Sequence, residues 1–497
     1  MSDRVPIRLL ASGVPGLDEV LGGGIPEFSL NLIAGGPGCG KTTLGHQIMF
    51  ASASPQRKAV YFSIVGEPPI KMLRYQQQYS FFDAAKVPDS IRFVYLGDEA
   101  LEAGLAKVLE LIVNEVKKSE PDIVVVDSFR SVVRRTLAEA HGDLELEYFM
   151  QRLAMHMTSW EATTFLLGEY RDGEEDNTVF TVADSILWLH QSVDRNSVVR
   201  KLRVVKMRGQ AQIPGLHTAR ITGDGYSVFP RLPKPEERKS AERFLNDRLS
   251  TGAPSLDEMM GGGIPRGYSV LLAGPSGSGK TVLSNRFIVE GVHRGEPGIV
   301  AIFEKRPNDY LHTTPQAKEF ERMVSEKKLE VLYLRPLDLS IDETLLALRE
   351  AVLRIGAKRA VIDSLSGLEL ALAPTFREDF RESLYRMVGA LTALEVTVMS
   401  TVELADSYVD LRFSPHGIAF LTDAIIMQRY VEIGGQLRRA LSVVKIRASQ
   451  HSKDLREYDI DSDGVIVVGK KLEGYEGILT GTPFKSEGKK NGDPEAG

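Results

Sequence analysis

The sequence predicts an α/β protein made of two tandem copies of one domain, each with a mostly parallel β-sheet covered by helices on both faces. Three observations support this prediction: a long internal repeat, short apolar runs rich in β-branched residues, and longer segments with helical spacing between them. The apolar runs are Lys58 to Ile64, Ile123 to Val126 and Thr163 to Leu167. Continuous apolar strands are expected where a parallel sheet is buried on both faces.

The repeat is visible from the first residues of each copy. Ser12 to Pro26 reads SGVPGLDEVLGGGIP, and Thr251 to Pro265 reads TGAPSLDEMMGGGIP, 239 positions later. Two pairs of lysines further along the chain, Lys41 with Lys280 and Lys206 with Lys445, keep this offset. Asp127 and Asp363 are 236 apart, so we expect about three residues to be lost before the second aspartate and restored after it, as in a surface loop.

The domain boundaries follow from composition. The segment FPRLPKPEERKSAER, from Phe229 to Arg243, replaces apolar periodicity with prolines and mixed charge, which is typical of a linker. The last residues are polar, rich in glycine and have little to bury, so a disordered tail is expected there. The predicted parts are a first domain at 1–230, a linker at 231–246, a second domain at 247–484 and a tail at 485–497.

Length and composition exclude several classes of protein. The chain has 497 residues, which is more than one core usually holds, and its 43% hydrophobic content is too high for a disordered chain. Its only cysteine, Cys39, cannot form an intrachain disulfide, and the N-terminus lacks a secretory signal, so we expect a cytoplasmic protein. No apolar run approaches the roughly 20 residues that cross a bilayer. The net charge of −6 gives no general attraction to polyanions, so neither a membrane nor a nucleic-acid partner is expected.

The strongest signal is a pair of glycine-rich loops, GGPGCGKT at Gly35 to Thr42 and GPSGSGKT at Gly274 to Thr281, each fitting G-x-x-x-x-G-K-[ST]. Each loop follows a predicted strand (Leu30 to Ala34, Val270 to Ala273) and precedes a predicted helix (Thr43 to Phe50, Val282 to Val289). Such a loop aims backbone N–H groups and a helix N-terminus at phosphates. The predicted nucleotide-binding residues are Gly35, Gly36, Gly38, Cys39, Gly40, Lys41, Thr42 and Thr43 in the first copy, and Gly274, Ser276, Gly277, Ser278, Gly279, Lys280, Thr281 and Val282 in the second.

The sequence also predicts a Mg²⁺ site beside each loop. Lys41 and Lys280 can reach the β- and γ-phosphates of ATP, and the hydroxyls of Thr42 and Thr281 can ligate the metal. Asp127 and Asp363 end the runs IVVVD and AVID, where a carboxylate suits Mg²⁺. The alternative for an aspartate at a strand end is to cap the following helix.

Hydrolysis needs a group that activates water, and the two copies differ in what they offer. If Pro68 is aligned with Pro307, Glu304 in AIFEKRP faces Val65, while Glu67 in FSIVGEPP faces Arg306. We predict Glu304 as the catalytic base of the second copy and Glu67 as that of the first, the alternative being that each is a solvated strand end. Glu169 and Glu403 also end predicted strands and are further candidates to orient water or sense the γ-phosphate.

Together, the duplicated SG-P-LDE-GGGIP segments, the paired P-loops and two K-x-R segments resemble the KaiC family of RecA-like ATPases over about residues 10 to 480. The resemblance implies a homohexameric double ring with ATP and Mg²⁺ at subunit interfaces. It also implies that the neighbouring subunit contributes Lys206 and Arg208 to one site and Lys445 and Arg447 to the other. The alternative for these cations is a pair of solvent-facing bases.

The leading functional hypothesis is an ATP-driven hexameric regulator that signals to a protein partner. A serine/threonine autokinase of the clock type is the first alternative, because Leu421-Thr422-Asp423 and Tyr430 to Ile433 match that family's second copy. The aligned acceptor positions hold Ala419 and Phe420, which lack hydroxyls; Ser414 and Thr422 are nearby but not aligned, and Lys305 stands where the clock member has a second acid.

A RecA-like DNA-binding ATPase is the second alternative, based on the basic residues Arg130, Arg134 and Arg135 after Asp127. The comparable stretch of the second copy, SLSGLELALAP from Ser364, has no base. A solvated charge cluster is therefore the favoured interpretation of these arginines.

Overall fold

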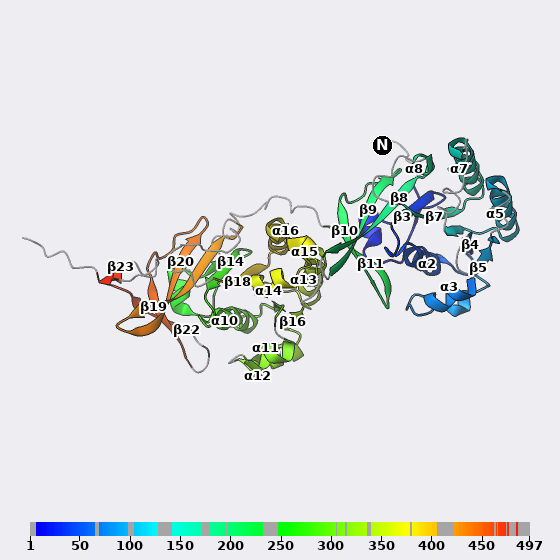
Figure 1. Ribbon diagram of the computed structural model, residues 1–497. Helices are drawn as coiled ribbons and strands as arrows, with labels where there is room; N and C mark the ends of the chain where they lie inside the picture. Colours follow the sequence, from blue (N-terminus) through cyan, green and yellow to red (C-terminus); the bar gives the residue numbers. More distant parts are fainter. Residues whose placement is uncertain are drawn as a thin grey trace, which may run out of the picture. The chain divides into compact units, whose positions relative to one another are not determined.

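The computed structural model contains two compact units, Met1–Leu232 and Pro233–Gly497, which match the two halves of the repeat (Figure 1). The structure describes residues 6–64, 69–97, 104–127, 142–170, 178–194, 197–231, 247–304, 306–313, 316–334, 339–377, 380–404, 421–461, 464, 466–473, 475–476 and 484–485. Most of the predicted linker and nearly all of the predicted tail lie outside the described residues.

The first unit is built on a nine-stranded sheet in which six neighbouring strands run parallel and the rest are antiparallel. In sheet order its strands are β11 (Gly225–Phe229), β10 (Leu216–Thr222), β9 (Ser197–Met207), β8 (Ser185–Asp194), β3 (Leu30–Gly35), β7 (Thr163–Glu169), β6 (Ile123–Asp127), β4 (Ala59–Ser63) and β5 (Ile91–Tyr95). The parallel part runs from β8 to β5, so the carboxyl ends of these six strands lie at one edge. β1 (Leu9–Leu10) and β2 (Ile25–Pro26) form a separate small ladder.

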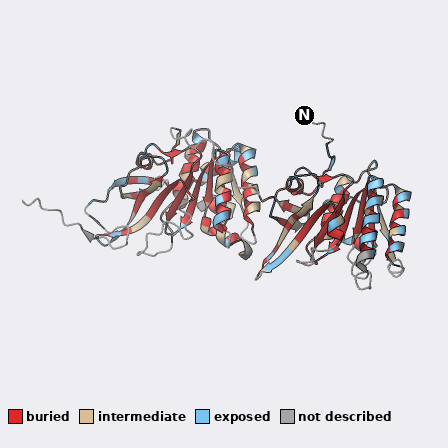
Figure 2. Ribbon diagram, turned by 90° about the horizontal axis from the view of Figure 1, so that it is seen from above, coloured by how far each residue is buried: buried red, intermediate tan, exposed pale blue. Residues whose placement is uncertain are grey.

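Helices cover both faces of this sheet because alternate strand residues point to opposite sides. Leu30 and Leu32 of β3 belong to a core with α5 (Leu105–Ser119), α7 (Gly142–Ser159) and α8 (Thr178–Val182). Ile33, the residue after Leu32, points to the opposite face and belongs to a core with α1 (Leu17–Leu21), α2 (Lys41–Ser52) and α3 (Pro69–Gln76). Figure 2 shows the buried strands between helices whose outer sides are exposed.

The second unit repeats this architecture in a second nine-stranded sheet. Its strands in order are β16 (Leu329–Tyr333), β15 (Gly298–Ile302), β17 (Arg359–Asp363), β18 (Thr397–Glu403), β14 (Ser269–Gly274), β19 (Ala424–Ile433), β20 (Gln436–Ile446), β21 (Arg456–Ile460) and β22 (Ile466–Lys471). Short two-stranded ladders join β12 (Arg248–Leu249) to β13 (Ile264–Pro265) and β23 (Tyr475–Glu476) to β24 (Phe484–Lys485).

Helices again flank the second sheet. Val300 and Ile302 of β15 form a core with α9 (Pro254–Met259), α10 (Lys280–His293) and α12 (Ala317–Ser325). Alternation leaves the intervening residues of β15 for the other face, where α13 (Ile341–Ile355) and α16 (Phe380–Ala393) pack against each other and against the sheet. Three shorter helices complete the described part: α11 (Pro307–Thr313), α14 (Leu365–Ala371) and α15 (Pro374–Arg377).

The predicted fold class is therefore confirmed, while one detail of the repeat is corrected. The offset between equivalent strands is 239 at β4 and β15 and 236 at β6 and β17, as predicted, but it falls further to 234 at β7 and β18 before it returns to 239 at β8 and β19. The missing residues are thus lost in at least two connections. No helix of the described residues combines the length and apolar character needed to cross a bilayer.

Candidate nucleotide-binding sites

The two glycine-rich loops have the same backbone conformation. Each joins the carboxyl end of a central parallel strand to a helix, β3 to α2 and β14 to α10. Gly38 and Gly277 have φ of 73° and 74°, and Gly40 and Gly279, which precede the helices, have φ of 98° and 97°. These values lie in the region that glycine tolerates best, so the loops turn where the motif places glycine. Both loops therefore present a helix N-terminus at the carboxyl edge of a sheet, which favours anions.

The two P-loop lysines lie folded over their loops. Lys41 Nζ donates to the carbonyls of Gly35 and Gly36 at 2.9 and 2.7 Å, and Lys280 Nζ donates to the carbonyls of Gly274 and Pro275 at 2.8 and 2.7 Å. Burial lowers the pKa of Lys280, and the nearby carboxylates of Glu403, Asp363 and Glu304 oppose this effect. These carbonyl contacts hold each ammonium group beside the loop where a phosphate would bind.

The predicted metal ligands are brought together in both units. Thr42 Oγ1 donates to Asp127 Oδ2 at 2.9 Å, and Thr281 Oγ1 donates to Asp363 Oδ2 at the same distance. Burial raises the pKa of Asp127, whereas hydrogen bonds from Tyr61 and Thr42 and the charge of Lys41 oppose the increase. A hydroxyl and a carboxylate side by side are hard oxygen donors of the kind that Mg²⁺ prefers.

No group of three or more His, Cys, Asp and Glu side chains that could hold a metal occurs among the described residues. The hydroxyl and carboxylate pair seen in each unit fits an ion that keeps several waters and binds substrate phosphates, as Mg²⁺ does.

The helix-cap alternative for Asp363 does not hold. The cap of α14 is the next residue, Ser364, whose side chain accepts a hydrogen bond from Gly367 N at 3.0 Å. The carboxylate of Asp363 instead accepts from Thr281 and from Thr401 Oγ1 of β18, the latter at 2.6 Å. In the first unit the residues that follow Asp127 lie outside the described part, and so do Arg130, Arg134 and Arg135.

Glu304 lies at a cavity of about 380 Å³ in the second unit, together with other predicted site residues. The cavity is lined by Ser276, Gly277, Gly279, Lys280, Thr281, Val282, Ile302, Glu304, Tyr310, Asp363, Ser364, Glu403 and Ile460. Ser364 Oγ donates to Glu304 Oε1 at 3.1 Å, which gives the glutamate a fixed neighbour. Ser364, Tyr310 and Ile460 were missed by sequence reasoning because only the fold brings them to the P-loop.

The remaining glutamates differ in what the structure describes. Glu169 and Glu403 end β7 and β18 and pair in register with Gly35 and Gly274, the first residues of the two loops. Both are therefore beside a P-loop, as their strand-end positions suggested. Glu67 lies outside the described residues, as do Lys305, Ser414, Ala419 and Phe420.

The K-x-R segments lie at the opposite edge of each sheet from the P-loop. Lys206 pairs with Ile186 near the start of β8, which runs parallel to β3 and reaches the P-loop edge at its other end. Lys206 Nζ donates to the carbonyls of Phe180 and Thr181, and Arg208 forms an ion pair of 3.1 Å with Asp184. These cations therefore lie away from the phosphate site of their own unit.

The second unit repeats this arrangement. Lys445 Nζ donates to the carbonyl of Thr422 at 2.8 Å, and Arg447 lies 3.5 Å from Asp423. Burial, together with the neighbouring arginine, lowers the pKa of both Lys206 and Lys445.

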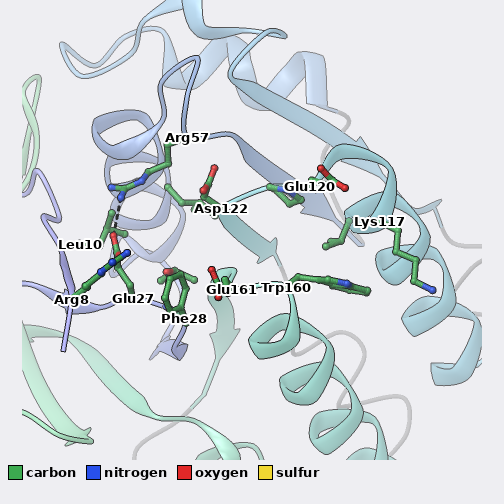
Figure 3. A pocket seen from close by; sticks show the side chains of 14 residues that line it. Arg8, Leu10, Glu27, Phe28, Arg57, Lys117, Glu120, Asp122, Trp160 and Glu161 are labelled. Carbon is green, nitrogen blue, oxygen red and sulfur yellow. Dashed lines mark hydrogen bonds and ion pairs between the residues drawn. The ribbon is translucent and has the colours of Figure 1, made fainter. Parts of the chain in front are cut away.

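A second cavity, of about 550 Å³, opens in the first unit at the amino ends of β6 and β7 (Figure 3). Phe28, Trp160 and Glu161 lie along one side of it, and an ion pair of 2.8 Å joins Arg57 to Glu27 at another. This cavity is at the edge of the sheet away from the P-loop and shares no lining residue with it.

Two similar α/β domains in tandem, each with a P-loop between a central parallel strand and a helix and with an aspartate at the end of a nearby strand, define a tandem P-loop NTPase of RecA-like fold. Comparison with known proteins then places the chain more closely. The family model described as the KaiC ATPase matches residues 10–233 and 249–472, so the chain belongs to the KaiC family.

Similar curated proteins carry clock names and match along nearly the whole chain. The chain is 28% identical over 490 residues to the circadian clock oscillator protein KaiC of Rippkaea orientalis, covering 96% of this chain and 92% of that protein. It is also 28% identical over 490 residues to the protein of the same name from Picosynechococcus, covering 96% and 93%. It is 26% identical over 493 residues to the circadian clock protein KaiC3 of Synechocystis, covering 96% and 95%.

Proposed function

We propose that this chain binds Mg-ATP at both P-loops, hydrolyses it, and acts as an ATP-driven homohexameric regulator. The observation that carries the proposal is the repeated geometry of one lysine over the loop and one Thr–Asp pair of 2.9 Å, found in both units. Membership of the KaiC ATPase family supports the same activity. Two independently diverged copies that keep this arrangement are best explained by nucleotide binding in each.

In this proposal each residue has a defined part. The loop amides and Lys41 or Lys280 hold the phosphates, which requires the ammonium group to leave the loop carbonyls that it now contacts. Thr42 with Asp127, and Thr281 with Asp363, would hold Mg²⁺, which neutralises charge on the β- and γ-phosphates when bound. Glu304 would take the proton of the attacking water in the second unit, with Ser364 orienting its carboxylate.

Completion of each site by a neighbouring subunit explains the position of the K-x-R segments. Because Lys206 and Lys445 lie at the edge of the sheet away from their own P-loops, they cannot serve those loops within one chain. Cations supplied across an interface would stabilise transition-state charge, as an arginine finger does. We therefore propose that Lys206 and Arg208 act at a neighbour's first site, and Lys445 and Arg447 at a neighbour's second site.

The proposed regulatory output rests on the relatives, which are named as circadian clock proteins. We expect the nucleotide state of the ring to be recognised by a protein partner. Autophosphorylation is the weaker proposal, because Ala419 and Phe420 cannot accept phosphate through a hydroxyl. Incubation with γ-labelled ATP tests it, and stoichiometric label on the protein would favour the kinase.

The central test combines nucleotide retention with phosphate release. Purified wild-type protein should retain close to two nucleotides per chain in the presence of Mg²⁺, and the single variants Lys41→Ala and Lys280→Ala should each lose one. The double variant should retain none and release no phosphate. Wild-type protein that binds no nucleotide would contradict the proposed function.

A further inference from the structure

Each candidate metal-binding aspartate accepts a second hydroxyl besides that of the P-loop threonine. In the first unit Tyr61 Oη donates to Asp127 Oδ2 at 2.6 Å. In the second unit Thr401 Oγ1 donates to Asp363 Oδ1, also at 2.6 Å. Such short O–H···O⁻ bonds are charge-assisted and stronger than bonds between neutral groups.

These two hydroxyls lie on opposite sides of the strand that ends at the aspartate. Strand β6, which ends at Asp127, lies between β4 and β7, and Tyr61 belongs to β4. Strand β17, which ends at Asp363, lies between β15 and β18, and Thr401 belongs to β18. The second hydroxyl therefore reaches the aspartate from one neighbouring strand in the first unit and from the other neighbouring strand in the second.

Each supporting hydroxyl is replaced by an apolar side chain at the equivalent position of the other unit. Tyr61 is the third residue of β4, and the third residue of β15 is Val300. Thr401 is the fifth residue of β18, and the fifth residue of β7 is Leu167. Neither valine nor leucine side chain has a donor, so among the described residues each unit has one supporting hydroxyl at a position where the other unit has none.

Packing fixes the position of both hydroxyls. Tyr61 is 1% exposed, and its ring packs against those of His46 and Phe93, with centroid distances of 4.5 and 5.4 Å. Thr401 is fully buried. Because neither side chain has room to turn away, each hydroxyl holds its carboxylate in one orientation.

We propose that Tyr61 and Thr401 are positioning residues that orient Asp127 and Asp363 toward Mg²⁺, and that the two copies achieve this from opposite neighbouring strands. This inference rests on the proposed function. Residues that hydrogen-bond a metal-binding side chain orient it, and their loss commonly weakens metal affinity about 10- to 100-fold. The two sites thus depend on different single residues for the same task.

The test measures metal binding in full-length protein whose second site is silenced by Lys280→Ala. Binding of a fluorescent ATP analogue is measured in EDTA and then across a Mg²⁺ titration. Tyr61→Phe removes only the hydroxyl, so we expect the half-saturating Mg²⁺ concentration to rise about 10-fold while affinity for the analogue in EDTA changes less than about 2-fold. An unchanged Mg²⁺ requirement, or an equal loss of affinity in EDTA, would overturn the inference.

A rescue variant tests the reciprocity directly. Leu167→Thr, added to Tyr61→Phe, places a hydroxyl where the second unit has Thr401 and should bring the Mg²⁺ requirement back toward that of the parent. No recovery in a folded double variant would overturn the claim that the two strand positions are equivalent. Tyr226→Phe is the control, because its buried hydroxyl has no hydrogen-bond partner among the described residues.

The second unit provides an independent measurement with Lys41→Ala as background. Thr401→Val should raise the Mg²⁺ requirement about 10-fold, and Thr401→Ser, which keeps the hydroxyl, should not. This pair decides the inference even if Tyr61→Phe does not fold. A Lys280→Ala or Lys41→Ala background that binds no nucleotide with Mg²⁺ present would instead count against the proposed function.

Discussion

Glu304 is the residue on which hydrolysis in the second unit should depend most. It lines the same cavity as Lys280 and Asp363 and is held by Ser364. Glu304→Gln keeps the size of the side chain but removes its basicity, so phosphate release from the second site should fall by roughly 10²- to 10⁴-fold with little change in nucleotide binding. The assay is phosphate release in a Lys41→Ala background. Retention of full turnover would remove Glu304 as the base.

Glu67 is the corresponding candidate in the first unit. Glu67→Gln in a Lys280→Ala background should lower phosphate release from the first site, because no other acid in FSIVGEPP precedes the aligned proline. The matched measurement is nucleotide affinity, which should stay within about 2-fold. Loss of turnover here but not in Glu304→Gln would place the hydrolytic activity in the first unit.

His46 makes the stability of the first unit depend on pH. Burial lowers its pKa to about 4, and the nearby Gln76 side chain opposes this only in part. An unfolded histidine titrates near 6.5, so between these values the unfolded state binds more protons and stability falls as pH decreases. The loss between pH 7.5 and pH 5 should be about 2 kcal/mol.

The measurement of this pH effect is denaturant unfolding followed by tryptophan fluorescence, which reports the first unit because both tryptophans, Trp160 and Trp188, belong to it. His46→Leu replaces the ring by an apolar side chain of similar burial and should remove most of the pH dependence. A wild-type stability that stays flat from pH 7.5 to 5 would contradict the buried neutral histidine.

At the scale of single residues, the sequence predicts the side chains that belong to a motif, but it does not predict the side chains that only the packing of the fold brings to the site. The candidate P-loop residues were located from their spacing and the two aspartates from their positions at the ends of apolar runs, and the fold brings each aspartate to the threonine of its loop. Ser364 and Tyr61 were not identified, because a hydroxyl that supports a carboxylate has no motif and is brought there only by strand order.

At the scale of elements, the turn from β14 into α10 places the strictest requirement on residue type. Gly279 has φ of 97°, and a Cβ there would lie 2.4 Å from Ile460. Gly279→Ala should therefore strain the backbone and displace the loop, and nucleotide affinity at the second site should fall at least 10-fold. The check is retention of the ATP analogue in a Lys41→Ala background.

Gly295→Ala is the matched control for this turn. Its φ of 78° is also positive, but no atom lies within 4 Å of the added Cβ. It should reduce stability without affecting nucleotide binding. If both variants bind equally well, the close contact with Ile460 does not shape the loop.

The strands and helices around the P-loops were predicted within a few residues, because continuous apolar runs are unambiguous where a sheet is covered on both faces. The path of the repeat between Asp127 and β8 was predicted less well. The offset falls to 234 at β7 and β18, a shift that no motif marks, since connections change length without changing the core.

For the whole molecule, assembly and hydrolysis are expected to depend on each other. A chain with Lys280→Ala lacks the lysine of its second P-loop but can still supply Lys445 and Arg447 to a neighbour. A chain with Arg447→Ala keeps an intact second P-loop but cannot supply the arginine to a neighbour. Mixed rings should contain some complete second sites, so phosphate release by the mixture should exceed the sum of the two separate proteins. A Lys41→Ala background in both chains confines the measurement to that site.

The reverse outcome of the mixing experiment is equally clear. If the mixture shows only the sum of the two activities although size measurements with ATP show mixed assemblies, the cations do not act between subunits. Rings that form equally without ATP would separate assembly from nucleotide binding. The fold class and duplication were predicted from residue patterns, whereas the proposed subunit contacts rest on the family resemblance, since such contacts depend on surfaces that no motif describes.

The ion pair between Arg57 and Glu27, beside the second cavity, limits which segments could be exchanged between the two units. Glu27 and Arg57 occupy positions equivalent to Arg266 and Glu296, and both pairs have a 2.8 Å contact with their charges exchanged. A chimera that transplants the segment containing one partner would oppose two acids or two bases. Exchange of segments between the two halves would therefore keep this ion pair only where both partners move together.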